Sequence, residues 1–381
     1  MTENSTSKTN LVIVVIGIIF MFSLLFYAFG STHDGIYSIA RVKTIEPIEN
    51  EDPESTEKAF AVEIEMLDGP YSGKTLAAEH FETPGSAYNL SLTPGETVLA
   101  VTEQQDDQLV VGIDEHYKSR RLMLLAMVII LVIAAIGGVN GVKSMLAMFF
   151  TLIVVFGFMA RMLMKGVPPL PLTVGCSLVI VIVNVLIIAG RTNKGFISAV
   201  GTLFGVILSG FFGWLSIFLL KLTGFSGDES TFLQLLDSTI DLRGIMLSGI
   251  IIGALGAVMD VAISIASALF EISLANPAYD RAQLFKSGMN IGRDVIGSMV
   301  NTLILAYTGA SLTLILVFAM QKEDFPLIKI MNMEFICTEV VRSLAGLFGM
   351  VLAIPITALL SSVVYTRWRV DATEPDGVEV E

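Results

Sequence analysis

Cysteine and histidine are scarce in this chain, and each scarcity excludes a kind of site. Two cysteines occur, Cys176 and Cys337, and both lie in apolar runs, so neither a disulfide framework nor a metal knuckle is expected. We interpret both as small core residues. The three histidines, His33, His80 and His116, all lie in one polar region, which excludes a histidine proton relay inside a membrane.

Two binding motifs are also missing. No Gly-x-x-x-x-Gly-Lys-Ser/Thr stretch occurs, so ATP-driven work would require another subunit, and no cofactor is predicted. No basic cluster occurs either, and the net charge is −13. Because phosphate binding needs a clustered basic surface, nucleic acid is excluded as a partner. The acidic residues concentrate at 46–115, 228–241 and 371–381, which leaves the rest nearly neutral.

The chain instead contains long apolar runs. Hydrophobic residues make up 54% and charged residues 15% of 381 residues, which is too apolar for one soluble domain, so most of the chain is predicted to contact the lipid bilayer. A spanning helix needs about 20 apolar residues to cover roughly 30 Å of hydrocarbon. The runs that meet this length are Leu11–Phe29, Leu122–Val139, Ser144–Met164, Pro169–Ile188, Phe196–Leu220, Gly244–Phe270, Ile291–Met320 and Phe335–Tyr365.

Two of these runs need a choice of interpretation. Leu11–Phe29 is longer than the apolar part of a usual signal peptide, and the residues after it resemble a cleavage site only weakly, so we predict a retained anchor. Ile291–Met320 is long enough to be tilted, or to begin as a cytoplasmic helix before it enters the membrane.

The polar segment between the first two runs has the pattern of a β module. Apolar and polar residues alternate from Phe60 to Met66, as in a half-buried strand, and Asp68-Gly69-Pro70 is a turn signal. Further strand-like runs are Ile36–Val42, Thr97–Thr102 and Gln108–Ile113. We therefore predict a barrel or sandwich of about five strands. Metal binding at Asp114, Glu115 and His116, with His80 and His33, remains open beside the interpretation as a solvated acidic surface.

The predicted fold is an all-α polytopic membrane bundle of about eight transmembrane helices, with a small all-β soluble module inserted after the first helix. The predicted parts are a tail and first helix at 1–29, the β module at 30–118, a seven-helix transmembrane domain at 119–370, and an acidic tail at 371–381. We expect both termini in the cytoplasm and the β module outside, because basic residues of the tight loops Gly138–Lys143 and Gly190–Lys194 are then inside. Total Lys and Arg counts do not decide this orientation.

Polar residues recur at helical spacing in two consecutive spans. Asp260, Ser264, Ser267 and Glu271 are spaced 4, 3 and 4, which at about 100° per residue places them on one face. The next span repeats the arrangement with a second set: Asn290, Asp294, Ser298 and Asn301. We predict that the two stripes face each other across one polar seam and bind an ion or substrate.

A carboxylate inside a span costs roughly 2.5–3.5 kcal/mol, so its retention requires a partner, a water-filled cavity or protonation. A structural alternative stays open: Glu271 and Asp294 would then lie near the membrane surface, with Asp294 paired to a basic neighbour and the serines bonded to backbone. Asp260 lies deeper among apolar residues, so this alternative fits it less well.

The last span adds a third set of candidates. Glu339 and Arg342 are three residues apart and are predicted either to form a structural ion pair or to join the binding site. Gly249, Gly253 and Gly256 are interpreted as small residues that let helices approach closely.

Three stretches resemble the YibE/F family of bacterial membrane proteins: Gly253–Ser267, Leu284–Gly297 and Asn301–Tyr307. The stretch from Asp68 to Lys74 in the β module is similar to the longer, YibE-like members. The resemblance covers most of the chain and implies a multi-pass protein of the bacterial plasma membrane, of a kind often described as permeases. It also implies a shorter relative of the same family as a partner, and a second copy of the chain is the alternative partner that we consider. It carries over no activity and no catalytic residue.

Three functions are consistent with these patterns. The first is a non-enzymatic permease or secondary transporter in which Asp260, with Asp294 and Asn301, binds a cation or proton. The second is a non-catalytic assembly or export accessory whose β module binds an envelope partner. The third is an intramembrane aspartyl protease, although neither Met259-Asp260 nor Arg293-Asp294 matches the sequence contexts of such enzymes.

Overall fold

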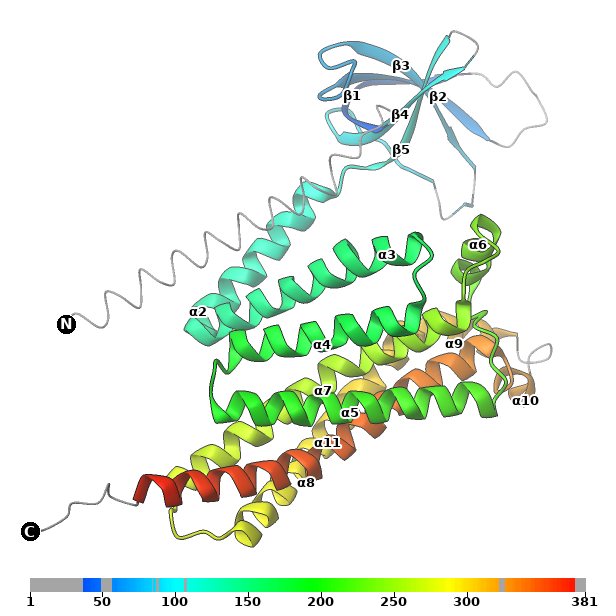
Figure 1. Ribbon diagram of the computed structural model, residues 1–381. Coiled ribbons are helices and arrows are strands. Elements are labelled where there is room, and N and C mark those ends of the chain that lie inside the picture. Colours follow the sequence, from blue (N-terminus) through cyan, green and yellow to red (C-terminus); the bar gives the residue numbers. More distant parts are fainter. Residues whose placement is uncertain are drawn as a thin grey trace, which may run out of the picture. The chain divides into compact units, whose positions relative to one another are not determined.

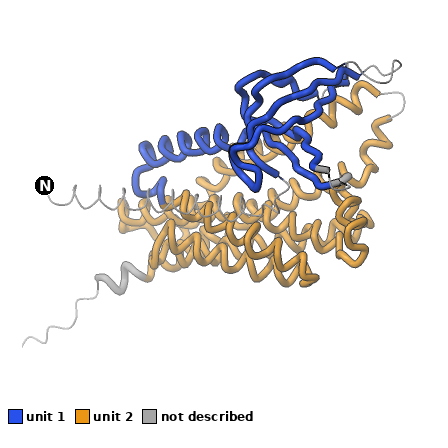
Figure 2. The backbone as a smooth tube through the Cα atoms, turned by 90° about the horizontal axis from the view of Figure 1, so that it is seen from above, with its two compact units in different colours: residues 1–142 blue, residues 143–381 orange. Residues whose placement is uncertain are grey.

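The computed structural model describes residues 37–48, 57–83, 85–86, 89–105, 108–321 and 326–373. Its chain divides into two compact units, residues 1–142 and 143–381 (Figure 2). The predicted first span, Leu11–Phe29, and residues 374–381 of the predicted acidic tail lie outside the described residues.

The β module is a closed five-stranded barrel (Figure 1). Its strands are β1 (Tyr37–Ile48), β2 (Lys58–Met66), β3 (Thr75–Glu82), β4 (Thr97–Gln105) and β5 (Gln108–His116). They follow the order β1-β2-β3-β5-β4, β1 pairs with β4, and β3 and β5 are parallel, which is a Greek-key order of the kind found in OB barrels. The prediction of a small five-stranded module is confirmed, and it takes the form of a barrel.

The alternation in β2 produces the barrel core. Val62, Ile64 and Met66 point inward and are at most 1% exposed, because successive side chains of a strand point to opposite faces. β3 was not predicted as a strand. Its inward positions hold Leu76, Ala78 and His80, and only the first of these is a large apolar side chain, so the periodic signal is weak.

The turn after β2 is held by the residues of the Asp68-Gly69 pair. The Asp68 carboxylate accepts a hydrogen bond from the backbone N–H of Ile39 on β1. Gly69 has φ +76°, and a Cβ there would collide with the buried hydroxyl of Ser38. Glycine is required because it adopts positive φ and leaves room for the approach.

The first helical stretch is interrupted. It consists of α2 (Ser119–Leu152), the π-helical segment η1 (Ile153–Met159) and α3 (Ala160–Met164). Within α2, Gly138 has φ 54° and ψ −138°, and a Cβ at Gly141 would lie 2.6 Å from the carbonyl oxygen of Ile133. The backbone therefore turns sharply at Gly138, where the sequence predicted a loop between two spans.

The second unit is a helical bundle (Figure 1). Its longer helices are α4 (Pro169–Ile188), α5 (Asn193–Leu219), α7 (Leu242–Ala275), α8 (Arg281–Ala310), α9 (Leu312–Met320) and α11 (Glu334–Thr373), and the short ones are α6 (Asp228–Leu236) and α10 (Leu327–Ile330). Helices α5, α7 and α11 pack on one another at its centre, α4 packs on α5 and α7, and α8 packs mainly on α11.

Small residues permit the close packing of α5 on α11. A Cβ at Gly349 would lie 2.5 Å from the carbonyl oxygen of Gly205, and a Cβ at Gly205 would lie 2.8 Å from that of Gly349. Two helix backbones thus approach each other directly, as small residues allow in membrane helices.

Five helical stretches of the described residues are long and apolar enough to cross a membrane: Ser119–Met164, Pro169–Ile188, Asn193–Leu219, Leu242–Ala275 and Glu334–Arg367. The helices Arg281–Ala310 and Leu312–Met320 meet the same criterion only when taken together, and they are bent by 59° at their junction, so they form either a sixth, broken span or a re-entrant loop. The predicted bundle of about eight spans is therefore only partly shown. Two predicted spans fall within the single stretch Ser119–Met164, and the first predicted span is not described.

Candidate functional site

Helix α7 has a buried face and an open face. Val258, Val261, Ile265 and Leu269 are 0% exposed and belong to the core of the helical unit. Asp260, Ser264 and Glu271, on the other side, are exposed, and Ser267 is half-buried. Three of the four residues of the polar stripe predicted from sequence are therefore exposed.

Helix α8 is divided in the same way. Its buried face carries Gly288 and Gly292, where a Cβ would lie 2.8 Å from Ala358 and 2.2 Å from Ile354, both on α11. The predicted stripe lies away from these contacts, and all of its members are exposed: Asn290, Asp294, Ser298 and Asn301.

The two stripes lie on helices that contact each other, but no direct polar contact joins them within the described residues. Ser298 donates a hydrogen bond to the backbone oxygen of Val295 at 3.1 Å. Glu271 pairs with Lys194 of α5 at 3.3 Å, and the Lys194 ammonium lies 3.9 Å from the centre of the Phe270 ring. The end of the α7 stripe is thus bound to α5, while Asp260, Ser264 and the α8 stripe remain open.

Asp260 lies near the middle of α7, between the glycine face and Ser264. It is exposed, and the described part of the chain provides no ion pair for it. Position 256, one turn earlier, has nothing within 4 Å of an added Cβ. The carboxylate therefore adjoins free space on this face of the helix.

A second polar group forms where α7, α8 and α11 meet. Glu339 and Arg342 on α11 form an ion pair at 3.5 Å with side chains 27% and 33% exposed, respectively. A Cβ at Gly249 would lie 3.6 Å from the Arg342 guanidinium, and a Cβ at Gly253 would lie 3.7 Å from the Tyr307 hydroxyl. The glycine face of α7 thus contacts polar side chains of two other helices, whereas direct backbone approaches occur at Gly205 and Gly349.

A cavity of about 720 Å³ adjoins this group. It is bounded by α8, α9, α10 and α11, its walls are mostly apolar, and Tyr307 and Glu339 contribute polar atoms to it. The 59° bend between α8 and α9 provides part of its wall. Its volume is within the range of about 300–1,000 Å³ typical of small-molecule sites.

Tyr307 was not identified as a candidate from sequence. It follows Asn301 by six residues, which at about 100° per residue rotates it by roughly 120° from the polar stripe of α8. Helical spacing therefore contains no signal for it. Its partners, Glu339 and Gly253, come from distant parts of the chain.

No group of three or more His, Cys, Asp or Glu side chains within the described residues is arranged to hold a metal ion. In the barrel, the His80 ring bonds to the backbone oxygen of Leu90 at 2.8 Å, and His116 lies 3.0 Å from Glu96. His33 lies outside the described residues.

Long apolar helices with an open acidic face define a helical membrane protein, here with a small β barrel at its N-terminal side. The sequence model of the YibE/F-like protein family matches residues 125–367, which is more than half of the chain. The chain belongs to the YibE/F family. The match begins after the barrel. Neither a curated protein nor a solved structure matches the chain.

Proposed function

We propose that this protein is a non-enzymatic permease in which Asp260 binds a proton or a cation on the open face of α7. The observation that carries the proposal is an exposed carboxylate near the middle of an apolar spanning helix, with no ion-pair partner among the described residues. A carboxylate at such a depth costs roughly 2.5–3.5 kcal/mol, so it is retained where function requires it.

The exposed stripe of α8 supports the proposal that water or a bound protein, and not lipid, covers this face of the helix. Asn290, Asp294, Ser298 and Asn301 would all contact acyl chains if lipid covered this face of the helix. Polar residues in spans face a bundle interior or a water-filled cavity. We propose that water and a second subunit cover the two stripes, and that this subunit is a shorter family relative or a second copy of the chain.

The apolar cavity beside Tyr307 and Glu339 supports a second part of the mechanism. Broken helices frame the binding sites of many transporters, and the bent α8–α9 pair borders this cavity. We propose that the cavity receives the apolar part of the cargo, while Asp260 exchanges the coupling ion. The glycine face of α7 connects the two regions, because Gly253 lies against Tyr307 and Asp260 follows seven residues later.

We further propose that Ser119–Met164 crosses the plasma membrane twice. Its 46 residues are about twice the length that one crossing needs, and the backbone turns at Gly138. With the proposed anchor at Leu11–Phe29, the total is eight spans. Because this number is even, both termini lie on the same side of the membrane, which we propose is the cytoplasm, and the barrel then lies outside.

The test of Asp260 uses the full chain in vesicles that contain a pH-sensitive dye. An imposed pH, Na⁺ or K⁺ gradient is expected to drive a pH change in wild-type vesicles. Asp260→Asn is expected to reduce that rate at least tenfold, because the amide cannot bind and release a proton. The matched control is Asp237→Asn, which changes an exposed aspartate next to α6 and is expected to leave the rate unchanged.

Equal insertion of the three proteins is checked by their yield in the vesicle fraction. A wild-type protein that moves no ion under any of the gradients contradicts ion exchange at Asp260 in the absence of cargo. A wild-type rate in Asp260→Asn removes this residue from the mechanism.

A further inference from the structure

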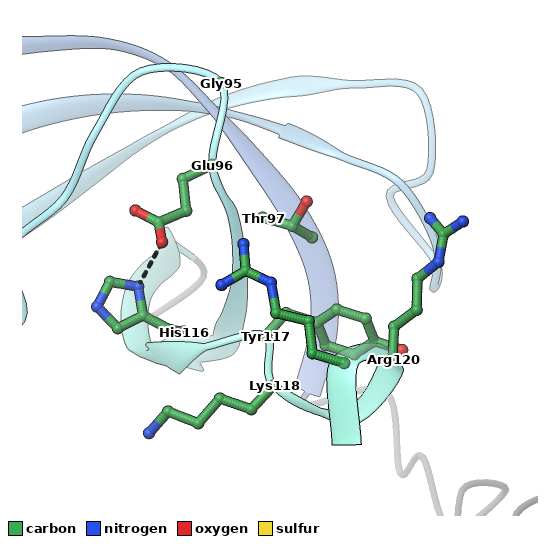
Figure 3. A pocket seen from close by; sticks show the side chains of 8 residues that line it. Gly95, Glu96, Thr97, His116, Tyr117, Lys118 and Arg120 are labelled. Atoms are coloured by element: carbon green, nitrogen blue, oxygen red, sulfur yellow. Dashed lines mark ion pairs between the residues drawn. The ribbon is translucent and has the colours of Figure 1, made fainter. Parts of the chain in front are cut away.

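A cavity of about 530 Å³ lies where the barrel chain continues into α2, within the first compact unit (Figure 3). Its walls come from the turn before β4 and the first residue of β4, from the end of β5 and the two residues after it, and from the first turn of α2. Four basic side chains line it: His116, Lys118, Arg120 and Arg121. The expectation that the chain has no basic cluster is therefore wrong at this position. The cavity is separate from the polar faces of the helical unit, and nothing in the proposed transport mechanism uses it.

Two of the four basic groups are already occupied by carboxylates. His116 lies 3.0 Å from Glu96, as the dashed line in Figure 3 shows. Lys118 donates a hydrogen bond to Glu115 at 2.5 Å, and this bond together with the Lys118 charge lowers the pKa of Glu115 below its ordinary value.

Arg120 and Arg121 are different. Both are exposed, and among the described residues neither has a carboxylate within ion-pair distance. With Lys118 and its partner Glu115 both counted, three permanent cations stand against two carboxylates, Glu96 and Glu115, which leaves one positive charge in excess. The cavity therefore has excess positive charge, which is complementary to an anion.

The position of the cavity indicates where that anion comes from. Leu122 directly follows the two arginines and begins an apolar run in which Leu122, Leu124 and Leu125 are 67%, 54% and 63% exposed. Exposed leucines of a spanning helix contact acyl chains. Arg120 and Arg121, which directly precede Leu122, therefore lie at the level of the lipid headgroups. Tyr117, beside them in the cavity wall, is a residue type enriched at that level.

We propose that this cavity binds the phosphodiester of an anionic phospholipid, with Arg120 and Arg121 as the phosphate ligands. Their planar guanidinium groups each present paired N–H donors that match phosphate oxygens. The acyl chains of the same lipid lie along the exposed leucines of α2. A soluble phosphate would use the arginines alone, whereas a phospholipid uses both features of the site.

The test is native mass spectrometry of the full chain in neutral detergent, with equal amounts of phosphatidylglycerol and phosphatidylcholine that carry identical acyl chains. The wild type is expected to retain phosphatidylglycerol in preference. Arg120→Gln with Arg121→Gln is expected to reduce that preference about thirtyfold, since loss of one such charge near a membrane surface weakens binding about fivefold. The matched control is Lys58→Gln with Lys74→Gln, which removes two exposed charges of the barrel outside the cavity.

Each single arginine variant is expected to lose about fivefold, so the test remains decisive if the double variant does not fold. Equal retention of the two lipids by the wild type overturns the proposal, and so does an unchanged preference in the arginine variants. Inorganic phosphate distinguishes the two sources of the anion. If it displaces phosphatidylglycerol at equal concentration, the site takes a soluble anion and the lipid assignment is wrong.

Discussion

Two acidic residues of the helical unit, Glu334 and Asp260, have opposite surroundings. Glu334 accepts hydrogen bonds from the backbone N–H groups of Thr223 and Gly224, both at 2.6 Å, and from the Thr223 hydroxyl at 2.7 Å. These bonds connect the start of α11 to the turn after α5. Asp260 has no ion-pair partner among the described residues and stands on an open face. A carboxylate that accepts several hydrogen bonds from the protein stabilises the fold, whereas an exposed carboxylate without such partners is available to exchange an ion.

Removal of the Glu334 carboxylate tests its role as an anchor. Glu334→Ala is expected to lower the free energy of unfolding by about 2 kcal/mol, because hydrogen bonds to a charged group contribute about 1.5–3 kcal/mol and this site is only half-buried. Glu229→Ala, which changes an exposed glutamate on α6, serves as the control. Thermal unfolding of the two variants in the same detergent measures the difference, and equal midpoints would contradict the anchor.

At the scale of the elements, two kinds of glycine have different effects on helix packing. Gly349 lies where α11 meets the backbone of α5, and a Cβ there would be 2.5 Å from the Gly205 oxygen. Gly256 on α7 has nothing within 4 Å of an added Cβ. The close contact therefore holds two central helices together, while the open position lies one turn before Asp260 on the exposed face of α7.

The same substitution at the two positions separates these effects. Gly349→Ala is expected to destabilise the protein by about 1–3 kcal/mol, because the added methyl group pushes two helix backbones apart. Gly256→Ala is expected to stabilise it by up to about 1 kcal/mol, because alanine favours the helix and meets no neighbour. Unfolding midpoints in detergent measure both, and the interpretation of the α5–α11 contact is wrong if Gly349→Ala is as stable as Gly256→Ala.

At the scale of the whole molecule, the barrel and the helical unit are separate compact bodies with separate cores. The barrel core is formed by residues such as Val62 and Ile64, and the helical core by residues such as Val258 and Leu269. The two proposed sites follow this division. The ion site lies on α7 in the helical unit, and the phospholipid site lies in the unit that contains the barrel.

The proposed orientation is tested with alkaline phosphatase, which is active only outside the cytoplasm. Phosphatase fused after Thr56, between β1 and β2, is expected to be active if the barrel lies outside. The control fusion after Arg191, in the loop between α4 and α5, is expected to be inactive because this loop is predicted to be cytoplasmic. The reverse pattern would show that the orientation is inverted.

Much of the fold could be predicted because its signals are local. The alternation through Val62 and Ile64 is imposed by strand geometry, and the lengths of the apolar runs are imposed by the thickness of the bilayer. The boundary at Gly138 was also visible, since the tight loop was predicted there and the backbone turns there. Strand β3 was not visible, because Ala78 and His80 provide little contrast between its two faces.

The sequence by itself determined that long apolar runs alternate with a small β module and that α7 and α8 carry polar stripes, since each pattern depends on neighbours within one strand or one helix. The closure of the β module into a barrel, through the pairing of β1 with β4, was decided by the tertiary structure. Only the tertiary structure decided that Glu271 pairs with Lys194, that Tyr307 and Arg342 meet the glycine face of α7, and that Arg120 and Arg121 line a cavity. These contacts join residues from separate elements or depend on how the chain turns between elements. Helical and strand periodicity specify which residues share a face, but packing between elements decides what that face meets.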